Sequence, residues 1–187
     1  MATDSSTDTS RTAAHTSEFS EFEEGDINLV SIWLKTDPVR WVAGAMAGIF
    51  AGAVTLVFAG LLASTHGMEF LFPAKIAAIP FMGNVATETG MHMGPIGLGI
   101  LVHEVLCAVI GAVYAHFTGT NSFKPLLAAG LMWGIFSWVF ICNLMSQSFT
   151  AIRALELPHN ATFLSMLVFG VMLSSTGFFD RALRRGN

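Results

Sequence analysis

The chain has 187 residues, of which 53% are hydrophobic and only 12% are charged, and its mean hydropathy is +0.62. A soluble domain carries about 25% charged residues, so the low charged fraction excludes most soluble enzymes. The high hydrophobic fraction excludes a disordered protein. Nine Lys and Arg against thirteen Asp and Glu give a net charge of −4, which leaves no basic surface for a nucleic acid. We therefore predict an integral membrane protein that has the lipid bilayer as a partner.

Two segments at the start of the chain differ from the rest. Residues 1–26 are rich in Ser, Thr and acidic residues and have little to bury, which predicts a disordered acidic tail. Residues 27–37 carry apolar side chains at roughly helical spacing, which predicts an amphipathic helix on the membrane surface. Asp37 and Pro38 end this segment and begin the next helix. The membrane domain is therefore expected at residues 38–187.

Four later segments are apolar, and each is near the ~20 residues that a helix needs to cross about 30 Å of hydrocarbon. In lipid the backbone must satisfy its own hydrogen bonds, so each segment is expected to be helical. The predicted fold class is an all-α integral membrane four-helix bundle. The predicted spans are residues 41–64, 95–117, 125–147 and 160–179.

The connections between these spans are of two kinds. Residues 65–94 are long and still apolar, and their FLFPAKIAAIPFM stretch is too short to span but too apolar to lie free in water. We predict a re-entrant or interfacial segment packed on the bundle. The connection TGTNSFK is a tight polar turn, so the second and third spans are expected to form an antiparallel hairpin.

The basic residues predict the orientation in the membrane. Cytoplasmic loops of membrane proteins carry an excess of Lys and Arg. If both termini are cytoplasmic, Lys75 and Arg153 lie on the outer side, and the inner side holds the other seven basic residues. Those seven are Arg11, Lys35, Arg40, Lys124, Arg181, Arg184 and Arg185. We therefore expect both termini in the cytoplasm.

Small residues form stripes on the predicted helices. Gly44, Gly48 and Gly52 recur at intervals of four on the first span, and Gly130 and Gly134 do so on the third. Such stripes let helix backbones approach closely in a membrane. They predict either packing within the bundle or, for the first span, a docking face for another membrane subunit.

Two ionisable residues are expected near the middle of the bilayer. His103 and Glu104 lie in the second span, where a charged acid is costly unless it is neutral, paired or hydrated. One hypothesis is a proton relay or an ion path. The alternative is a pair of uncharged groups that bond to neighbouring helices, with Asn143 and Ser137 of the third span as candidate partners.

Histidines and methionines gather on the predicted outer rim. A pairing of imidazole with thioether sulfur suits copper, whereas histidines with a carboxylate suit zinc or iron. The alternative is that these residues hold no metal and form a contact surface for an outer domain. The candidate ligands are His66, Glu88, Met91, His92, Met93 and His159.

Several motifs resemble the YagU-like group of small four-helix bacterial inner-membrane proteins. They are the AGIFAGAV stretch at residues 47–54, His103 followed by Gly111 and Tyr114, the LLAAGLMWG stretch at 126–134 and the FFDRALRR stretch at 178–185. The resemblance spans roughly residues 41–185 and implies a location in the bacterial inner membrane. The acidic tail and the MHM run at 91–93 depart from the pattern. The group has no established catalytic residues that the resemblance could assign to positions in this chain.

The functional expectation is a non-catalytic, multi-pass membrane protein that serves as an accessory or structural subunit of a larger complex. No nucleophile–base pair or phosphate-binding loop is recognisable in the sequence. One alternative is a small transporter or proton-handling protein that uses Glu104 and His103. A second is metal handling at the outer rim. No cofactor is expected apart from that possible metal ion.

Overall fold

The structure is a computed structural model, and it describes residues 37–153, 155 and 158–186. The described part is helical and contains no strand. Four of its helical stretches are long and apolar enough to cross a membrane: Pro38–Thr65, Met93–Thr118, Phe123–Met145 and His159–Arg185. The chain is thus an all-α four-helix membrane protein, as predicted. The acidic tail and the surface helix predicted for residues 1–26 and 27–37 fall outside the described residues, apart from Asp37.

The first span is helix α3 (Pro38–Thr65), and its start follows the sequence signal. The Asp37 carboxylate accepts hydrogen bonds from the backbone N–H groups of Val39 and Arg40, at 3.1 and 3.3 Å. Pro38 occupies the first turn, where its missing N–H leaves no hydrogen bond unmade. The second span, α5 (Met93–Thr118), ends at Gly119, whose φ of +56° is a left-handed conformation that favours glycine.

The third span is interrupted near its end and the fourth near its middle. Helix α6 (Phe123–Val139) continues as the π-helical segment η2 (Phe140–Met145), followed by the short helices α7 (Ser146–Ser148) and α8 (Thr150–Arg153). Helix α9 (His159–Leu173) is followed by α10 (Thr176–Arg185), with a break at Ser174 and Ser175.

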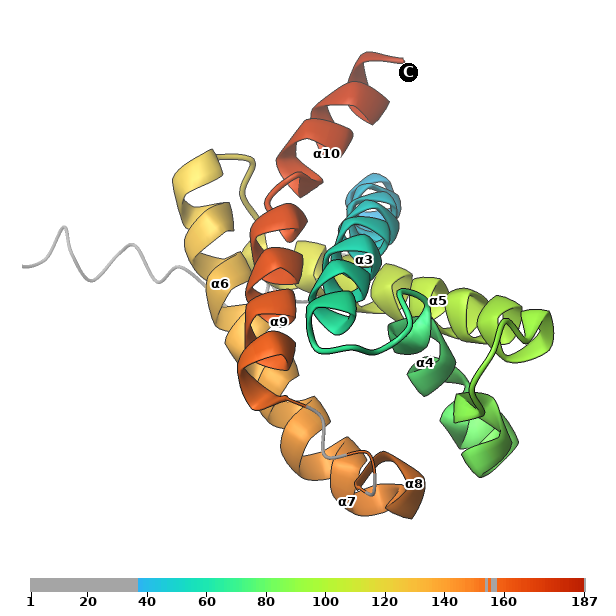
Figure 1. Ribbon diagram of the computed structural model, residues 1–187. Coiled ribbons are helices and arrows are strands. Elements are labelled where there is room, and N and C mark those ends of the chain that lie inside the picture. The colour runs from blue at the N-terminus through green and yellow to red at the C-terminus, as the bar shows by residue number, and fades with distance from the viewer. Residues whose placement is uncertain (1–36, 154, 156–157, 187) are drawn as a thin grey trace, which may run out of the picture. The chain divides into compact units, whose positions relative to one another are not determined.

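Helix packing follows the small-residue stripes. A Cβ atom added at Gly48 would overlap the Cys107 carbonyl of α5, and one added at Gly130 would overlap the Gly170 carbonyl of α9. The stripes therefore bring α3 against α5 and α6 against α9, and in Figure 1 α6 and α9 run side by side. The stripe Gly44, Gly48 and Gly52 is buried inside this chain, so that face is not open to another subunit.

The predicted hairpin of the second and third spans needs correction. Helices α5 and α6 meet near the turn that joins them, where the Tyr114 hydroxyl donates to the Leu126 carbonyl at 2.5 Å. Beyond that contact they diverge, and α6 packs along α9 instead (Figure 1). The turn joins the two helices as predicted, but the glycines of α6 and α9 place α6 beside α9.

The apolar connection after α3 forms helix α4 (Phe72–Met82) and a 3-10 turn, η1 (Gly83–Thr87). Helix α4 packs on α5 at Gly99, where an added Cβ would overlap the Ala74 carbonyl. A small apolar cluster that includes Ala78, Ile79 and Ile152 joins α4 to α8. The segment packs on the bundle, as the sequence predicted.

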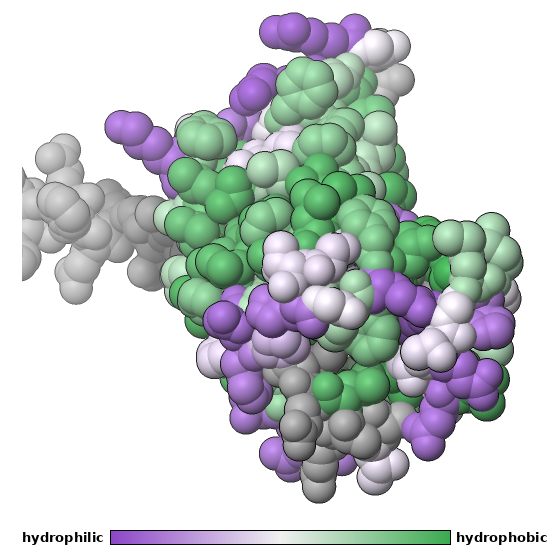
Figure 2. Space-filling model, in the orientation of Figure 1, coloured by the Kyte–Doolittle hydropathy of each residue, from purple (hydrophilic) through white to green (hydrophobic). Residues whose placement is uncertain are grey.

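The bundle has two ends, which we name by what lies there. The α10 end holds Asp37, the turn Gly119–Ser122 and α10, and the Asp37 carboxylate accepts a hydrogen bond from Arg184 of α10. The loop end holds α4, η1, α7 and α8. Figure 2 shows an apolar surface across the middle of the molecule, with hydrophilic side chains near α10 at the top and in the lower part of the view. This arrangement fits a protein that lies in a bilayer.

Candidate functional site: a cavity in the membrane domain

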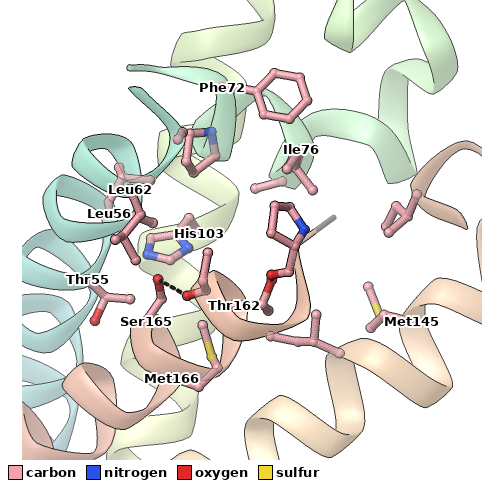
Figure 3. A pocket seen from close by; sticks show the side chains of 18 of the residues that line it. Thr55, Leu56, Leu62, Phe72, Ile76, His103, Met145, Thr162, Ser165 and Met166 are labelled. Atoms are coloured by element: carbon pink, nitrogen blue, oxygen red, sulfur yellow. Dashed lines mark hydrogen bonds between the residues drawn. The ribbon is translucent and has the colours of Figure 1, made fainter. Parts of the chain in front are cut away.

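A cavity of about 260 Å³ lies toward the loop end, between α3, α4, α5, α9 and the η2 segment. Its wall is mostly apolar, with Ala59 from α3, Ile76 from α4 and Met166 from α9 among the lining side chains. Residues of η2 reach the same wall, so the π-helical segment of the third span contributes to the cavity. Figure 3 shows Ile76, Met145 and Met166 approaching the cavity from different helices.

Among the described residues of this wall, His103 is the one ionisable side chain (Figure 3). Its Nε2 atom lies 3.2 Å from the Gly52 carbonyl oxygen and 3.6 Å from the Cys107 sulfur. A carbonyl can only accept a hydrogen bond, so this contact assigns the proton of a neutral ring to Nε2. The Nδ1 atom is then a hydrogen-bond acceptor.

The hydroxyl groups in the same wall are used differently. Ser165 donates to the Ala161 carbonyl at 2.9 Å, and Thr162 donates to the Pro158 carbonyl at 3.1 Å, both within the first turns of α9. Both hydroxyl groups therefore donate their protons to backbone carbonyls at the start of α9. The Thr55 hydroxyl is buried and has no partner within the described residues. The His103 imidazole and the Thr55 hydroxyl are therefore the polar groups of the described wall that do not bond to a carbonyl of their own helix.

Glu104 lies beside His103 in sequence but does not line the cavity. Its Oε2 atom is buried without a hydrogen-bond partner in the described part of the chain. A Cβ added at Gly52 would lie 3.0 Å from that oxygen, so the carboxyl group packs against α3. The third span does not supply the predicted partners: Asn143 is exposed and donates to the Val139 carbonyl of its own helix, at 3.0 Å. No hydrogen bond described here joins Ser137 to either residue.

The predicted metal ligands at the rim do not come together. His66 caps α3, and its Nδ1 atom lies 2.9 Å from the Leu62 carbonyl. His92 precedes α5, and its Nε2 atom lies 3.1 Å from the Thr89 carbonyl. Across residues 37–153, 155 and 158–186, no group of three His, Cys, Asp or Glu side chains is placed to hold a metal ion. The shared site expected for His66, His92, His159 and Glu88 is not assembled in the described residues, and a metal ion at the rim stays a prediction. Met91 and Met93 are exposed next to His92.

A buried lysine that the sequence analysis did not single out holds the loop end together. The Lys75 side chain is 1% exposed, and its ammonium group donates to Glu69 Oε2 at 2.5 Å and to the carbonyls of Glu88 and Gly90 at 2.9 and 2.6 Å. The Gly90 N–H donates to the other oxygen of Glu69 at 2.6 Å. This bond and the Lys75 ammonium hold the pKa of Glu69 below its usual value. We call this set the Lys75 clamp.

A second polar network, also not predicted, lies at the α10 end. Arg40 is 8% exposed and makes four hydrogen bonds, among them 2.7 Å contacts to the Ala115 carbonyl and to Asn121 Oδ1. Asn121 donates to the fully buried Asp180 at 2.5 Å, and Arg184 donates to Asp180 and to Asp37. This Arg40 network joins α3, the α5–α6 turn and α10.

A charge in an apolar segment is the sequence signal for both sets. Lys75 stands alone in FLFPAKIAAIPFM, and Asp180 is the one acid in the last span. Each must be paired or hydrogen-bonded if it is buried. The signal identifies these residues, but only the fold shows which partners they have.

Comparison with known proteins gives no family. No protein family, no curated protein and no solved structure matches this chain. The resemblance to the YagU-like group therefore stays a prediction.

Proposed function

We propose that this chain is a non-catalytic membrane protein that binds a lipid-like molecule, with an apolar body and one hydroxyl group, in the cavity at His103. One observation carries the proposal: an imidazole lies in the mostly apolar wall that the structure describes, and its Nε2 atom is already engaged by Gly52. The Nδ1 atom can then accept a hydrogen bond from a hydroxyl group.

The size and the wall of the cavity fit this class of ligand. Ligand pockets usually measure about 300–1,000 Å³, so a cavity of about 260 Å³ holds the hydroxyl end and the first part of a hydrocarbon chain. The rest of such a chain can extend among the membrane lipids. An apolar wall favours hydrocarbon, and the imidazole gives a hydroxyl the partner that lipid tails do not offer.

The other functions considered from the sequence have less support. The stripes that suggested a subunit of a larger complex are occupied within this chain. Glu104 does not line the cavity that His103 lines, which weakens a relay through both groups. The His and Glu residues predicted at the rim form no group of three in the described part of the chain. None of these observations carries a second proposal.

The proposal is tested by binding of 1-dodecanol to the full chain in phosphatidylcholine nanodiscs, measured by native mass spectrometry. Dodecyl methyl ether, which has no hydrogen to donate, is the matched probe. We expect saturable binding of the alcohol, about fivefold tighter than that of the ether, because one hydrogen bond contributes about 1 kcal/mol. His103→Leu removes the acceptor and should abolish the preference for the alcohol.

Two variants of α3 control for the cavity itself. Ala59→Phe fills the cavity, whereas Ala53→Phe adds the same ring at an exposed position outside its wall. We expect Ala59→Phe to lose binding of both probes and Ala53→Phe to keep it. Equal binding by the two variants, or no saturable binding by the unmodified chain, contradicts the proposal.

A further inference from the structure

A second hollow, of about 370 Å³, lies at the α10 end, separate from the cavity at His103. It is formed where the start of α6 faces the break between α9 and α10. Most of its wall is apolar, and the side chains that form this wall include Phe123, Leu126, Val171, Met172 and Phe178. A hydrocarbon chain can therefore lie against it.

A cation and a hydroxyl stand in the same wall. Arg181 is exposed and lines the hollow, and its Nη1 atom donates to the Asn121 carbonyl at 3.0 Å. That bond anchors the guanidinium at one nitrogen, while an arginine has five N–H donors. Ser175 also lines the hollow, and its hydroxyl oxygen is buried without a hydrogen-bond partner in the described residues.

The arginines of α10 have different roles. Arg184 is engaged by Asp180 and Asp37, on the side of the helix that meets α3. Arg181 belongs to the hollow on another side of α10, and its described polar contact is with a neutral carbonyl. Its positive charge is therefore not matched by the carboxylates that hold Arg184.

We propose that this hollow binds an anionic phospholipid, with the phosphate at Arg181 and Ser175 and an acyl chain along the apolar wall. Charge complementarity selects the headgroup, because a guanidinium binds phosphate through several charge-assisted hydrogen bonds. The apolar wall selects a lipid over a free phosphate ion. Asn121 and Phe123 place the hollow at the start of the third span, and lipid headgroups are found at the ends of spans.

The experiment uses the full chain in phosphatidylcholine nanodiscs with and without phosphatidylglycerol. Native mass spectrometry measures the lipid retained by each protein molecule, and thermal unfolding measures the stabilisation. We expect preferential retention of phosphatidylglycerol and a higher unfolding temperature in its presence. Arg181→Gln should weaken retention about fivefold, since one basic residue near anionic lipid contributes about 1 kcal/mol. Arg181→Lys should restore part of the loss.

The matched control is Arg185→Gln, which removes the same charge from the same helix at a residue that does not line the hollow. It should keep most of the retention. If Arg181→Gln does not fold, Val171→Trp fills the hollow and should give the same loss. Equal losses in Arg181→Gln and Arg185→Gln, or no preference for phosphatidylglycerol, overturn the proposal. Inorganic phosphate alone should give no stabilisation, and an equal effect of phosphate would also overturn it.

Discussion

The two ends of the bundle hold a buried cation in different ways. At the α10 end, Arg40 bonds to the α5–α6 turn, and the chain of contacts continues through Asn121 and Asp180 to α10. At the loop end, Lys75 bonds to Glu69 and to the carbonyls of residues 88 and 90, all within the connection between α3 and α5. One network joins separate membrane spans, whereas the other fixes a single connection.

This difference has a consequence for stability and for the site. A network that joins spans affects the whole bundle when it is broken, because several helices lose their relative position together. A clamp within one connection affects local opening, which costs less free energy than global unfolding. Helix α4 forms part of the cavity wall, so we expect the loop end to control access to the cavity and the α10 end to hold the bundle together.

The largest effect is expected for Arg40→Met. This change removes the arginine donor from the buried Ala115 carbonyl and from the part-buried Thr120 carbonyl and Asn121 side chain. Leaving buried polar groups unsatisfied costs about 1–3 kcal/mol each, so we expect a loss of about 3 kcal/mol in the free energy of unfolding. Thermal unfolding in detergent micelles measures this loss, and an unchanged unfolding temperature contradicts the structural role of the network.

A smaller and local effect is expected for Lys75→Met. The variant keeps an apolar side chain of similar length, and the oxygen of the half-exposed Glu69 can be hydrated after the change. We expect a loss of about 1–2 kcal/mol, with faster hydrogen exchange confined to the segment around α4. Exchange that increases equally in α6 and α9 contradicts the contrast between the two ends.

The smallest effect is the response of the loop end to acid. The pKa of Glu69 is lowered by the Gly90 N–H and the Lys75 ammonium, so the folded state favours the ionised carboxylate. The stabilisation of the folded state by the ionised Glu69 carboxylate is therefore complete above the pKa of the unfolded chain, about 4.3. It is lost as the pH falls through the lower pKa of the folded state. Hydrogen exchange of α4 should increase below about pH 4 in the unmodified chain. Glu69→Gln should exchange faster at neutral pH and show less additional change in acid.

Much of the fold follows from the sequence, because length and apolar composition decide what crosses a bilayer. The four spans, the helix start at Asp37 and the packing of the 65–94 connection all agree with the structure. The neighbour of α6 was not predictable, because every span carries small residues. A stripe of small residues on one helix does not determine which other helix packs against it. The break between α9 and α10 and the π-helical segment before α7 also carry no clear sequence signal.

The site was only partly predictable. The sequence identifies His103 as a residue that needs an explanation, and the structure places it in a cavity wall. The partners proposed for it on the third span were wrong, because α6 packs along α9 and contacts α5 only near their shared turn. The rim histidines share one end of the bundle in sequence order, but each ring bonds to a carbonyl of its own local segment or lies exposed. A common depth in the membrane does not bring side chains within reach of one ion.

The most direct measurement of the central claim is the nitrogen NMR spectrum of His103 in lipid bilayers, assigned by comparison with His103→Leu. The account predicts that a neutral ring carries its proton on Nε2, and that 1-dodecanol shifts the Nδ1 resonance as it binds. A proton on Nδ1, or an Nδ1 resonance that does not move while dodecanol saturates the protein, contradicts the account.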